Sequence, residues 1–502
     1  MISIIENYSL SVTIALLLFS TMASAFSAGG GSKNNNLFVG VDLGTSGARV
    51  SIIEKNDSSS LYTEVYTDSI LWSQEDAYDD PDAWVRAVET LIQGAGADDA
   101  SILSRVASIC ISGTSASCLL MDRKTLEMSR PARMYNFDVV TAGSGTFGTR
   151  AMQLVDKHAP PKHTARAATG SLAKLVAWAL ETPLTSNEVL CHQSDYVSAK
   201  FLGTASPVTS DWHNCLKLGY DVRNQEWPKW IEACLKDAGI EDPLGGDGVI
   251  PTKVISPGLE MGTICSAMSQ KLGLSKDVKI VGGTTDSNAA FFAAAGTTPV
   301  MGTAVTSLGS TLAMKQLSPT YVEDADRGVY SHRFPTFSND DENNEAWLVG
   351  GASNVGCAVF RQLGFSNEEL KELSQEIDPS TDSELSYYPL TKTGERFPVA
   401  DSNKSPVLEP VPTSRKEYLH GLLQSIGDVE RDGFKVLQEL GSQPPSTVYT
   451  CGGGSQNPTW SQMRERRLSS AFGSIITVRK AECTEASVGA AFLAAATFSK
   501  LS

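Results

Sequence analysis

The sequence predicts an α/β protein of more than one domain, and three features indicate this. Strand-like runs at residues 37–44, 48–54 and 106–115 alternate with helix-like stretches such as residues 81–96, a pattern typical of layered folds with a mixed sheet. The 502 residues exceed what one hydrophobic core usually serves, so two or three domains are expected. Two similar hairpins, at Asp42 and Ser307, suggest two related halves that face each other.

Composition excludes several classes of function. A hydrophobic content of 41% and a charged content of 20% describe an ordinary soluble globular protein. The net charge of −16 argues against nucleic-acid and anionic-membrane partners, because both need a basic surface. The nine cysteines form no C-x-x-C pair and the six histidines no H-x-x-x-H pair. We therefore expect reduced, mostly buried thiols and neither a disulfide framework nor a zinc site.

Residues 1–36 predict a targeting presequence and spacer. An apolar stretch runs into Ala23-Ser24-Ala25, a small-x-small cleavage site, and a Gly/Ser/Asn spacer follows. The stretch is short for a membrane span, so no stable membrane association is expected after removal, although an uncleaved anchor is the alternative. The "ASAF" junction resembles the bipartite presequences of algae with complex plastids. It favours a plastid (chloroplast), with the secretory pathway or the cytoplasm as alternatives.

The first hairpin carries an aspartate and a glycine-rich turn. Two apolar strands flank Gly44, Thr45, Ser46 and Gly47, and Asp42 precedes the turn. Such a turn exposes backbone N–H groups and hydroxyls that suit phosphate oxygens. Asp42 is then placed to hold Mg²⁺, directly or through water. A surface hairpin with ordinary turn residues is the alternative.

Three further elements follow in order. Asp286 comes after a Gly-Thr turn and before an Ala-rich helix, where it is either a helix N-cap or a base for an attacking hydroxyl. Residues 307–311 form a second hydroxyl-and-glycine loop for the terminal phosphates. The glycines at 452–454 allow a flat adenosine ring to lie against the backbone, before a helix that begins near Pro458.

These elements together resemble the FGGY family of carbohydrate kinases, from Leu37 to about Phe498. The ordered set carries the resemblance rather than any one motif. The matching segments are, in order, "VGVDLGTSGAR", "WSQEDAYDDPDAWVRAV", "VISPGLEMGTI", "GGTTDSNAA", "TSLGST", "YYPLTKTGERFPVAD", "CGGGSQNPTWSQM" and "ECTEASVGAAFLAA".

The resemblance implies two actin/Hsp70-like (ribonuclease H-like) α/β domains, residues 37–297 and 298–502, around an interdomain ATP cleft. It implies ATP-dependent phosphorylation of a sugar or polyol hydroxyl, with Asp286 as general base and Asp42 as the Mg²⁺-linked carboxylate. By the same resemblance the phosphates contact Gly44, Thr45, Ser46, Ser307, Gly309 and Ser310. The adenosine contacts Gly452, Gly453, Gly454 and Asn457.

The sugar side departs from the xylulokinase pattern. Thr114, Ser115 and Ser117 replace a Gln-Met-His-Gly segment, and Tyr135, Asn136 and Asp138 stand where Trp-x-Asp-x-Arg is usual. The candidate sugar-binding residues are therefore Thr114, Ser115, Asn136, Asp138 and Asp286. This pattern resembles the plant and cyanobacterial branch that phosphorylates D-ribulose to D-ribulose 5-phosphate. D-xylulose, a glycerol-type polyol, and a non-catalytic actin-fold protein that binds nucleotide or sugar are the alternatives.

Several other residues have two interpretations. Arg464, Arg466 and Arg467 either meet phosphate or form a solvated helix face, and the second is favoured. Trp84 either packs near the sugar or is simply buried. Glu395 and Arg396 are expected to hold the structure between the domains, and His332 to be structural. Partners other than the sugar and ATP, and the oligomeric state, are not predicted.

Overall fold

A computed structural model describes residues 36–56, 62–74, 77–142, 145–244, 246–335 and 345–499. The expected presequence, apart from Asn36, lies outside the described residues. Residues 36–502 form one compact unit. In the described ranges no helix is both long and apolar enough to cross a membrane.

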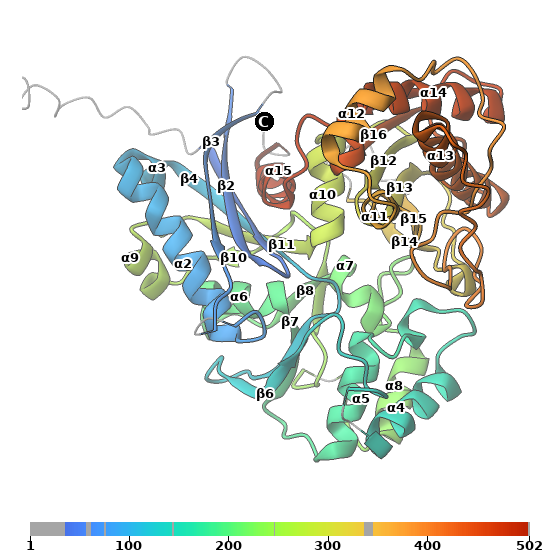
Figure 1. Cartoon of the computed structure of the whole chain (residues 1–502). Coiled ribbons are helices and arrows are strands. Elements are labelled where there is room, and N and C mark those ends of the chain that lie inside the picture. Colours follow the sequence, from blue (N-terminus) through green and yellow to red (C-terminus); the bar gives the residue numbers. More distant parts are fainter. Residues whose placement is uncertain are drawn as a thin grey trace, which may run out of the picture. The chain divides into compact units, whose positions relative to one another are not determined.

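The first sheet has six strands in the order β10-β11-β4-β1-β2-β3 (Figure 1). β1 pairs antiparallel with β2 and parallel with β4, and β4 pairs parallel with β11. The carboxyl ends of β1, β4 and β11 therefore lie at one edge of the sheet. The strands span β1 (Leu37–Leu43), β2 (Gly47–Lys55), β3 (Tyr62–Leu71), β4 (Val106–Gly113), β10 (Glu260–Thr263) and β11 (Lys279–Thr285).

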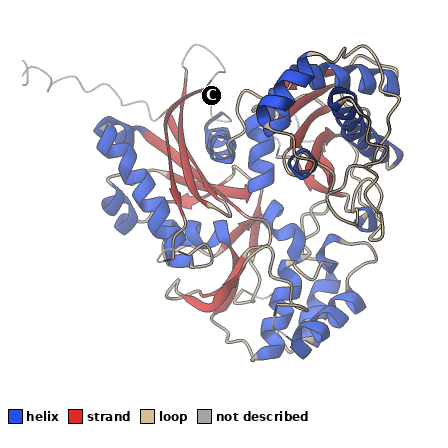
Figure 2. Ribbon diagram, viewed as in Figure 1, coloured by secondary structure: helices blue, strands red, loops and turns tan. Residues whose placement is uncertain are grey.

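Helices cover both faces of this sheet (Figure 2). Leu37, Val39 and Val41 of β1 share a core with one set of helices, whereas Phe38 shares another with the opposite set, as expected because side chains alternate along a strand. The first set comprises α2 (Pro81–Asp98), α3 (Ala100–Arg105), α6 (Gln193–Leu202) and α9 (Ser266–Leu272). The second comprises α10 (Asp286–Ala295) and α15 (Ala486–Ser499). A Cβ at Gly40 would lie 1.9 Å from Ser487 O of α15, so a glycine is required there.

Trp84 of α2 agrees with the interpretation that it is simply buried. Its side chain is fully buried, and its Nε1 donates to Tyr78 O at 2.7 Å. Asp80 accepts from the Asp82 amide and caps this helix, and Pro81 is its first residue.

The second sheet, in the order β14-β15-β13-β12-β16-β17, repeats the pairing of the first. β12 pairs antiparallel with β13 and parallel with β16, as β1 does with β2 and β4. The predicted relation between the two halves is therefore confirmed in their sheets. The exact domain boundaries stay a prediction. The strands span β12 (Thr303–Leu308), β13 (Leu312–Ser318), β14 (Tyr330–Arg333), β15 (Trp347–Ser353), β16 (Thr447–Cys451) and β17 (Thr477–Lys480).

The second half has further helices, two of which, α13 and α14, are joined by a buried ion pair. They are α11 (Ala358–Gln362), α12 (Asn367–Gln375), α13 (Arg415–Glu439) and α14 (Pro458–Phe472). Arg464 of α14 donates from Nε and Nη2 to the Glu430 carboxylate of α13, both at 2.6 Å. Its Nη1 donates to Thr450 Oγ1 at 2.9 Å. The solvated-face interpretation is thus wrong for Arg464, which is 2% exposed.

The segment between β4 and β10 contains a region with its own core, to which β5, β7, α4, α5 and α8 contribute. Its strands are β5 (Cys118–Asp122), β6 (Met128–Arg133), β7 (Glu188–His192), β8 (Thr209–Asp211) and β9 (Lys253–Ile255). Its helices are α4 (Gly145–His158), α5 (Ser171–Glu181), α7 (Trp212–Cys215) and α8 (Lys229–Asp237).

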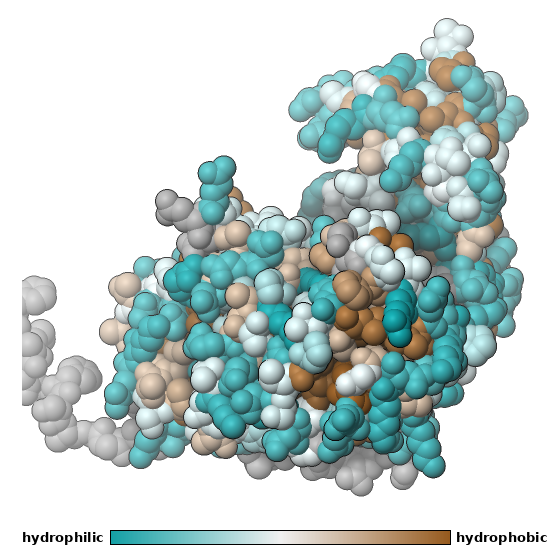
Figure 3. Space-filling model, turned by 90° about the horizontal axis from the view of Figure 1, so that it is seen from below, coloured by the Kyte–Doolittle hydropathy of each residue, from teal (hydrophilic) through white to brown (hydrophobic). Residues whose placement is uncertain are grey.

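The expectation for the cysteines can be checked on the described residues. All nine cysteines are free, and six of them are buried, which confirms the prediction that the cysteines are mostly buried. One face of the unit is mostly hydrophilic, with a group of apolar side chains within it (Figure 3).

Candidate active site

Two carboxylates and a serine meet at the carboxyl ends of parallel strands. Asp42 of β1 is paired in register with Ser112 of β4, and Ser112 with Thr284 of β11, two residues before Asp286. Ser112 Oγ lies 3.0 Å from Asp42 Oδ1. This edge of a parallel sheet is where α/β proteins bind ligands. The fold thus brings both predicted catalytic aspartates to one place.

The turn after Asp42 is held by its own backbone and by Trp72. Gly44 N donates to Gly47 O at 2.9 Å, and Trp72 Nε1 donates to Gly44 O at 2.9 Å. Thr45 and Ser46 are exposed. Their hydroxyls are therefore available to a ligand at this turn, as a phosphate loop requires.

The charge of Asp286 affects the protonation of Asp42. Burial, and then the negative charge of Asp286, raise the pKa of Asp42 to about 6, against the opposing effects of Ser112 and Arg49. Burial also raises the pKa of Asp286, while the Ser287 amide, Lys315 and Lys217 lower it. A carboxylate with a raised pKa at a strand end is suited to accept a proton near neutral pH.

The oxygen donors beside the first turn fit a magnesium ion. Asp42 supplies one carboxylate whose charge is poorly solvated, and Thr45 and Ser46 supply exposed hydroxyls. Mg²⁺ prefers such a site, with one or two carboxylates, phosphate oxygens and water.

Lys315 is a site residue that the sequence analysis missed. It lies on β13 of the second sheet, and its Nζ donates to Ser287 Oγ at 3.0 Å and to Asn288 Oδ1, both at the start of α10. Burial, together with the charge of Lys217, lowers its pKa to about 7, although Asp286 opposes the shift. Its signal in the sequence is a lone cation within the apolar run of a strand.

A cavity of about 610 Å³, which we call the acceptor cavity, is lined by Ser287, the residue that follows Asp286. Ser287 and Lys315 line it from the Asp286 side, with Lys217, His332 and Arg396 among the other lining residues. Its volume is in the range of small-molecule sites. It has room for a sugar next to a base.

None of the five predicted sugar residues, Asp286 included, is among the residues that line the acceptor cavity. Thr114 is buried, and its Oγ1 lies 2.5 Å from Ser117 Oγ and 3.0 Å from Gln193 Oε1. Ser115 is half-buried and Asn136 is exposed. Their contact with a sugar stays a prediction.

Asp138 and Lys174 stabilise the loops around these residues. Asp138 Oδ1 accepts from the Val140 and Thr141 amides, at 2.8 and 3.1 Å, and so closes its own turn. The buried Lys174 donates to Ala116 O and Met134 O, both at 2.7 Å. Burial lowers the pKa of Lys174 to about 8.

A second cavity, of about 1130 Å³, combines two of the three loops predicted for the nucleotide, and the turn at residues 44–46 is not among its lining. Gly309 and Ser310 come from the turn between β12 and β13, and Gly453, Gly454 and Asn457 from the loop after β16. Ser307, at the end of β12, is half-buried. We call this the nucleotide cavity.

Two of the three glycines after β16 are required by close packing. Gly452 has φ +78°, and a Cβ there would lie 2.7 Å from Leu308 O. A Cβ at Gly454 would lie 2.7 Å from both Leu308 and Trp460. A Cβ at Gly453 would meet nothing within 4 Å, so its backbone is open to a ligand.

Asn457 connects this loop to α12. Its Oδ1 accepts from the Trp460 amide at 2.9 Å and caps α14. Its Nδ2 donates to Ser374 Oγ of α12 at 2.8 Å. Asn457 therefore positions two walls of the nucleotide cavity.

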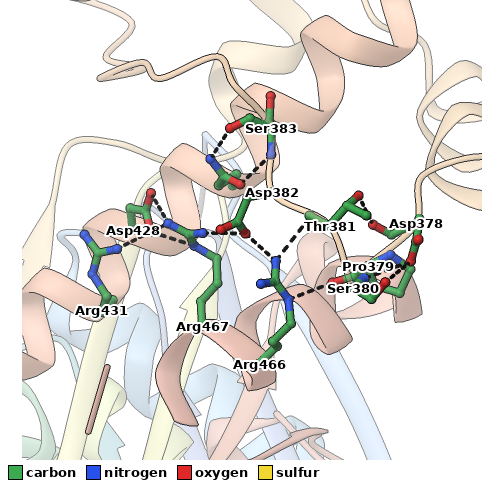
Figure 4. A network of polar contacts seen from close by, with 11 residues as sticks. Asp378, Pro379, Ser380, Thr381, Asp382, Ser383, Asp428, Arg431, Arg466 and Arg467 are labelled. Atoms are coloured by element: carbon green, nitrogen blue, oxygen red, sulfur yellow. Dashed lines mark hydrogen bonds and ion pairs between the residues drawn. The ribbon is translucent and has the colours of Figure 1, made fainter. Parts of the chain in front are cut away.

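Arg466 and Arg467 anchor the segment that follows α12 (Figure 4). Arg466 donates to Pro379 O at 3.0 Å and to the Asp382 carboxylate. Arg467 joins Asp382 at 2.8 Å to Asp428 of α13 at 2.6 Å. These two arginines thus form neither a phosphate site nor a free helix face, and they hold α12 through its following segment.

We expect Asp382→Ala to raise the KM for ATP about 2- to 5-fold and to leave the KM for the sugar unchanged. The substitution removes two ion pairs, and an exposed pair contributes about 0.2–1 kcal/mol. Steady-state kinetics with each substrate varied in turn will measure the effect. Glu368→Gln, an exposed site on α12 itself, is the control and should change neither KM. An unchanged KM for ATP in Asp382→Ala contradicts the role of the network.

Glu395 has a structural role, although not the role between the domains that was expected, and His332 is buried. Glu395 accepts from Ser353 Oγ at 2.6 Å and from Asn354 N at 2.7 Å. Its partners all lie in the second half, so the expected role between the domains is wrong for Glu395. Arg396 is exposed at the acceptor cavity. His332 is buried, as expected, and it also reaches that cavity.

Two aspartates at one sheet edge, a cavity lined by the predicted nucleotide loops and an acceptor cavity are parts that a phosphotransferase needs. Residues 261–498 match the FGGY family of carbohydrate kinases, C-terminal domain. The match covers this part of the chain, and together with the relatives below it indicates that the chain is a sugar or polyol kinase.

Individual relatives agree with this assignment. The xylulose kinase of Bacillus subtilis (strain 168) is 23% identical over 443 residues, which are 85% of this chain and 82% of that protein. The solved xylulose kinase from Rhodospirillum rubrum has a TM-score of 0.71 at 18% identity, and covers 91% of this chain and 89% of its own. Plasmodium falciparum glycerol kinase with ADP has a TM-score of 0.71 at 14% identity, covering 92% and 90%. The actin/Hsp70-like fold is thereby confirmed.

Proposed function

We propose that the enzyme transfers the γ-phosphoryl group of ATP, with Mg²⁺, to D-ribulose and produces D-ribulose 5-phosphate. The observation that carries the kinase chemistry is Asp286, whose charge raises the pKa of Asp42 and whose neighbour Ser287 lines a sugar-sized cavity. The choice of D-ribulose rests on Thr114, Ser115 and Asn136, polar residues at positions where the xylulokinase motifs differ.

The residues divide the chemistry between them. A sugar hydroxyl attacks the γ-phosphorus, its proton passes to an Asp286 oxygen, and ADP leaves. Asp42, with Thr45 and Ser46, would hold the magnesium ion, which when bound offsets the charge of the phosphates. Lys315 places a cation from the second sheet at the start of α10, next to the base.

The proposal is tested by ADP production from the full chain with Mg-ATP and each of D-ribulose, D-xylulose, L-ribulose and glycerol. We expect the highest kcat/KM with D-ribulose. A higher value with D-xylulose or glycerol overturns the choice of sugar. Bound ATP without turnover of any acceptor favours instead a non-catalytic protein that binds nucleotide or sugar.

We also propose a plastid (chloroplast) location, supported by the Ala23–Phe26 junction in the sequence. The alternatives are the secretory pathway and the cytoplasm. Amino-terminal sequencing of the protein isolated from its own cells tests the cleavage on which this rests. A chain that keeps residues 1–25 contradicts it.

A further inference from the structure

The acceptor cavity is unusually rich in cations for a neutral sugar. Its lining includes five basic side chains, namely Lys162, Arg166, Lys217, Lys315 and Arg396. A single carboxylate, Asp326, is among its lining residues. The segments that supply these charges are far apart in the sequence, and only the fold brings them together.

Two of the five cations are already neutralised. Lys162 forms ion pairs with Asp326 at 3.2 Å and Asp324 at 3.7 Å. Arg166 forms one with Asp156 at 2.8 Å.

The other three cations, Lys217, Lys315 and Arg396, lack such compensation. Among the residues that the structure describes, no carboxylate lies within ion-pair distance of any of them. Lys315 is held by neutral oxygens only. Lys315 and Lys217 act electrostatically on Asp286, and the charged side chains that line the cavity are mostly positive.

His332 adds an independent sign of a missing ligand. It is 3% exposed, it lines the cavity, and its Nδ1 has no hydrogen-bond partner. Its neighbour His213 is satisfied, since its two ring nitrogens lie 2.7 Å from Thr284 Oγ1 and 2.8 Å from Arg333 O. A buried polar atom without a partner is costly, and a bound oxyanion would supply the partner.

We propose that the acceptor cavity also binds the phosphate group of sugar phosphates, which thereby compete with the neutral sugar. Three separate cations and a ring nitrogen match the several oxygens of a phosphate better than a single hydroxyl. The volume of about 610 Å³ admits a monosaccharide phosphate. If the proposed function holds, the product is one such ligand, and the enzyme slows as its product accumulates.

The test is titration calorimetry on the full chain, with ADP saturating so that the nucleotide cavity is filled. The probes are D-ribulose 5-phosphate, inorganic phosphate and D-ribulose. We expect the sugar phosphate to bind about 10-fold or more tightly than the sugar, because hydrogen bonds between charged groups are the stronger ones. Sugar-phosphate binding no tighter than that of the sugar overturns the inference.

Lys217→Gln and Arg396→Gln locate the site. Each should weaken D-ribulose 5-phosphate about 5- to 50-fold and change D-ribulose less than about 3-fold. Lys392→Gln is the matched control, because this exposed lysine lies on the same segment as Arg396 and does not line the cavity. Unchanged ADP affinity shows that each variant is folded. Equal effects of all three substitutions place the phosphate elsewhere and overturn the inference.

The experiments distinguish a failure of this inference from a failure of the proposed function. Turnover of D-ribulose with no binding of its phosphate in the cavity contradicts the inference alone. Binding of the sugar phosphate, lost in Lys217→Gln and Arg396→Gln, without turnover of D-ribulose supports the inference and contradicts the choice of acceptor.

Discussion

Asp286→Asn is expected to lower kcat about 10²- to 10⁴-fold, the usual contribution of a positioned general base. The amide has the same shape as the carboxylate, and its oxygen still accepts the hydrogen bond that the Ser287 amide gives to Asp286 Oδ1. It cannot take a proton from the sugar hydroxyl. Chemistry should therefore fail while α10 and the strand before it stay in place.

Two measurements separate lost chemistry from lost structure. ADP production with saturating sugar gives kcat, and calorimetry gives the affinity for ATP, which should stay within about 3-fold because the nucleotide cavity does not include Asp286. Asp277→Asn is the matched control, since this exposed aspartate lies two residues before β11, at the opposite end of that strand from Asp286. More than a tenth of the activity left in Asp286→Asn rules out this residue as the base.

The parts of the site that the sequence predicts are those made by neighbours in the chain. The turns after Asp42 and Ser307 combine glycine with hydroxyl residues between strands, and the loop at 452–454 needs glycine for local packing. Such features follow from backbone geometry within a few residues. The structure confirms these loops and their position at strand ends.

The parts that the sequence does not predict depend on distant segments. Lys315 in a strand is typical of a solvated edge, and only the approach of α10 to the second sheet makes it a site residue. Lys217 joins the same cavity from nearly 100 residues earlier in the chain. Arg464 shows the same limit, because helical periodicity does not reveal that Glu430 of another helix faces it. Pairing between distant side chains is decided by tertiary packing.

Asp42→Asn should remove activity and at the same time stabilise the fold. Loss of a preorganised electrostatic group lowers kcat about 10²- to 10³-fold in other enzymes, and we expect a loss of that size when Asp42 can no longer offer a negative charge to the magnesium ion and phosphates. ADP production measures it. Activity near that of the unchanged enzyme contradicts a role for this carboxylate.

The gain in stability follows from the pKa of Asp42, which is about 6 in the fold against 3.8 for a free side chain. The folded state therefore holds a proton that the unfolded chain releases, and the ionised carboxylate lowers the free energy of unfolding as pH rises from about 4 to above 6. At pH 8 Asp42→Asn removes this cost, of about 1–3 kcal/mol. The gain shrinks as pH falls from 6 toward 4.

Urea unfolding of both proteins at pH 8 and pH 5 measures the difference. Ser112→Ala is the matched control, because it removes the hydrogen bond that lowers the pKa of Asp42, so it should destabilise the protein more at pH 8 than at pH 5. If Asp42→Asn is less stable than the unchanged enzyme at pH 8, the ionised Asp42 carboxylate does not destabilise the fold. A gain at pH 8 with lost turnover shows that the fold tolerates a destabilising charge because the phosphoryl transfer needs it.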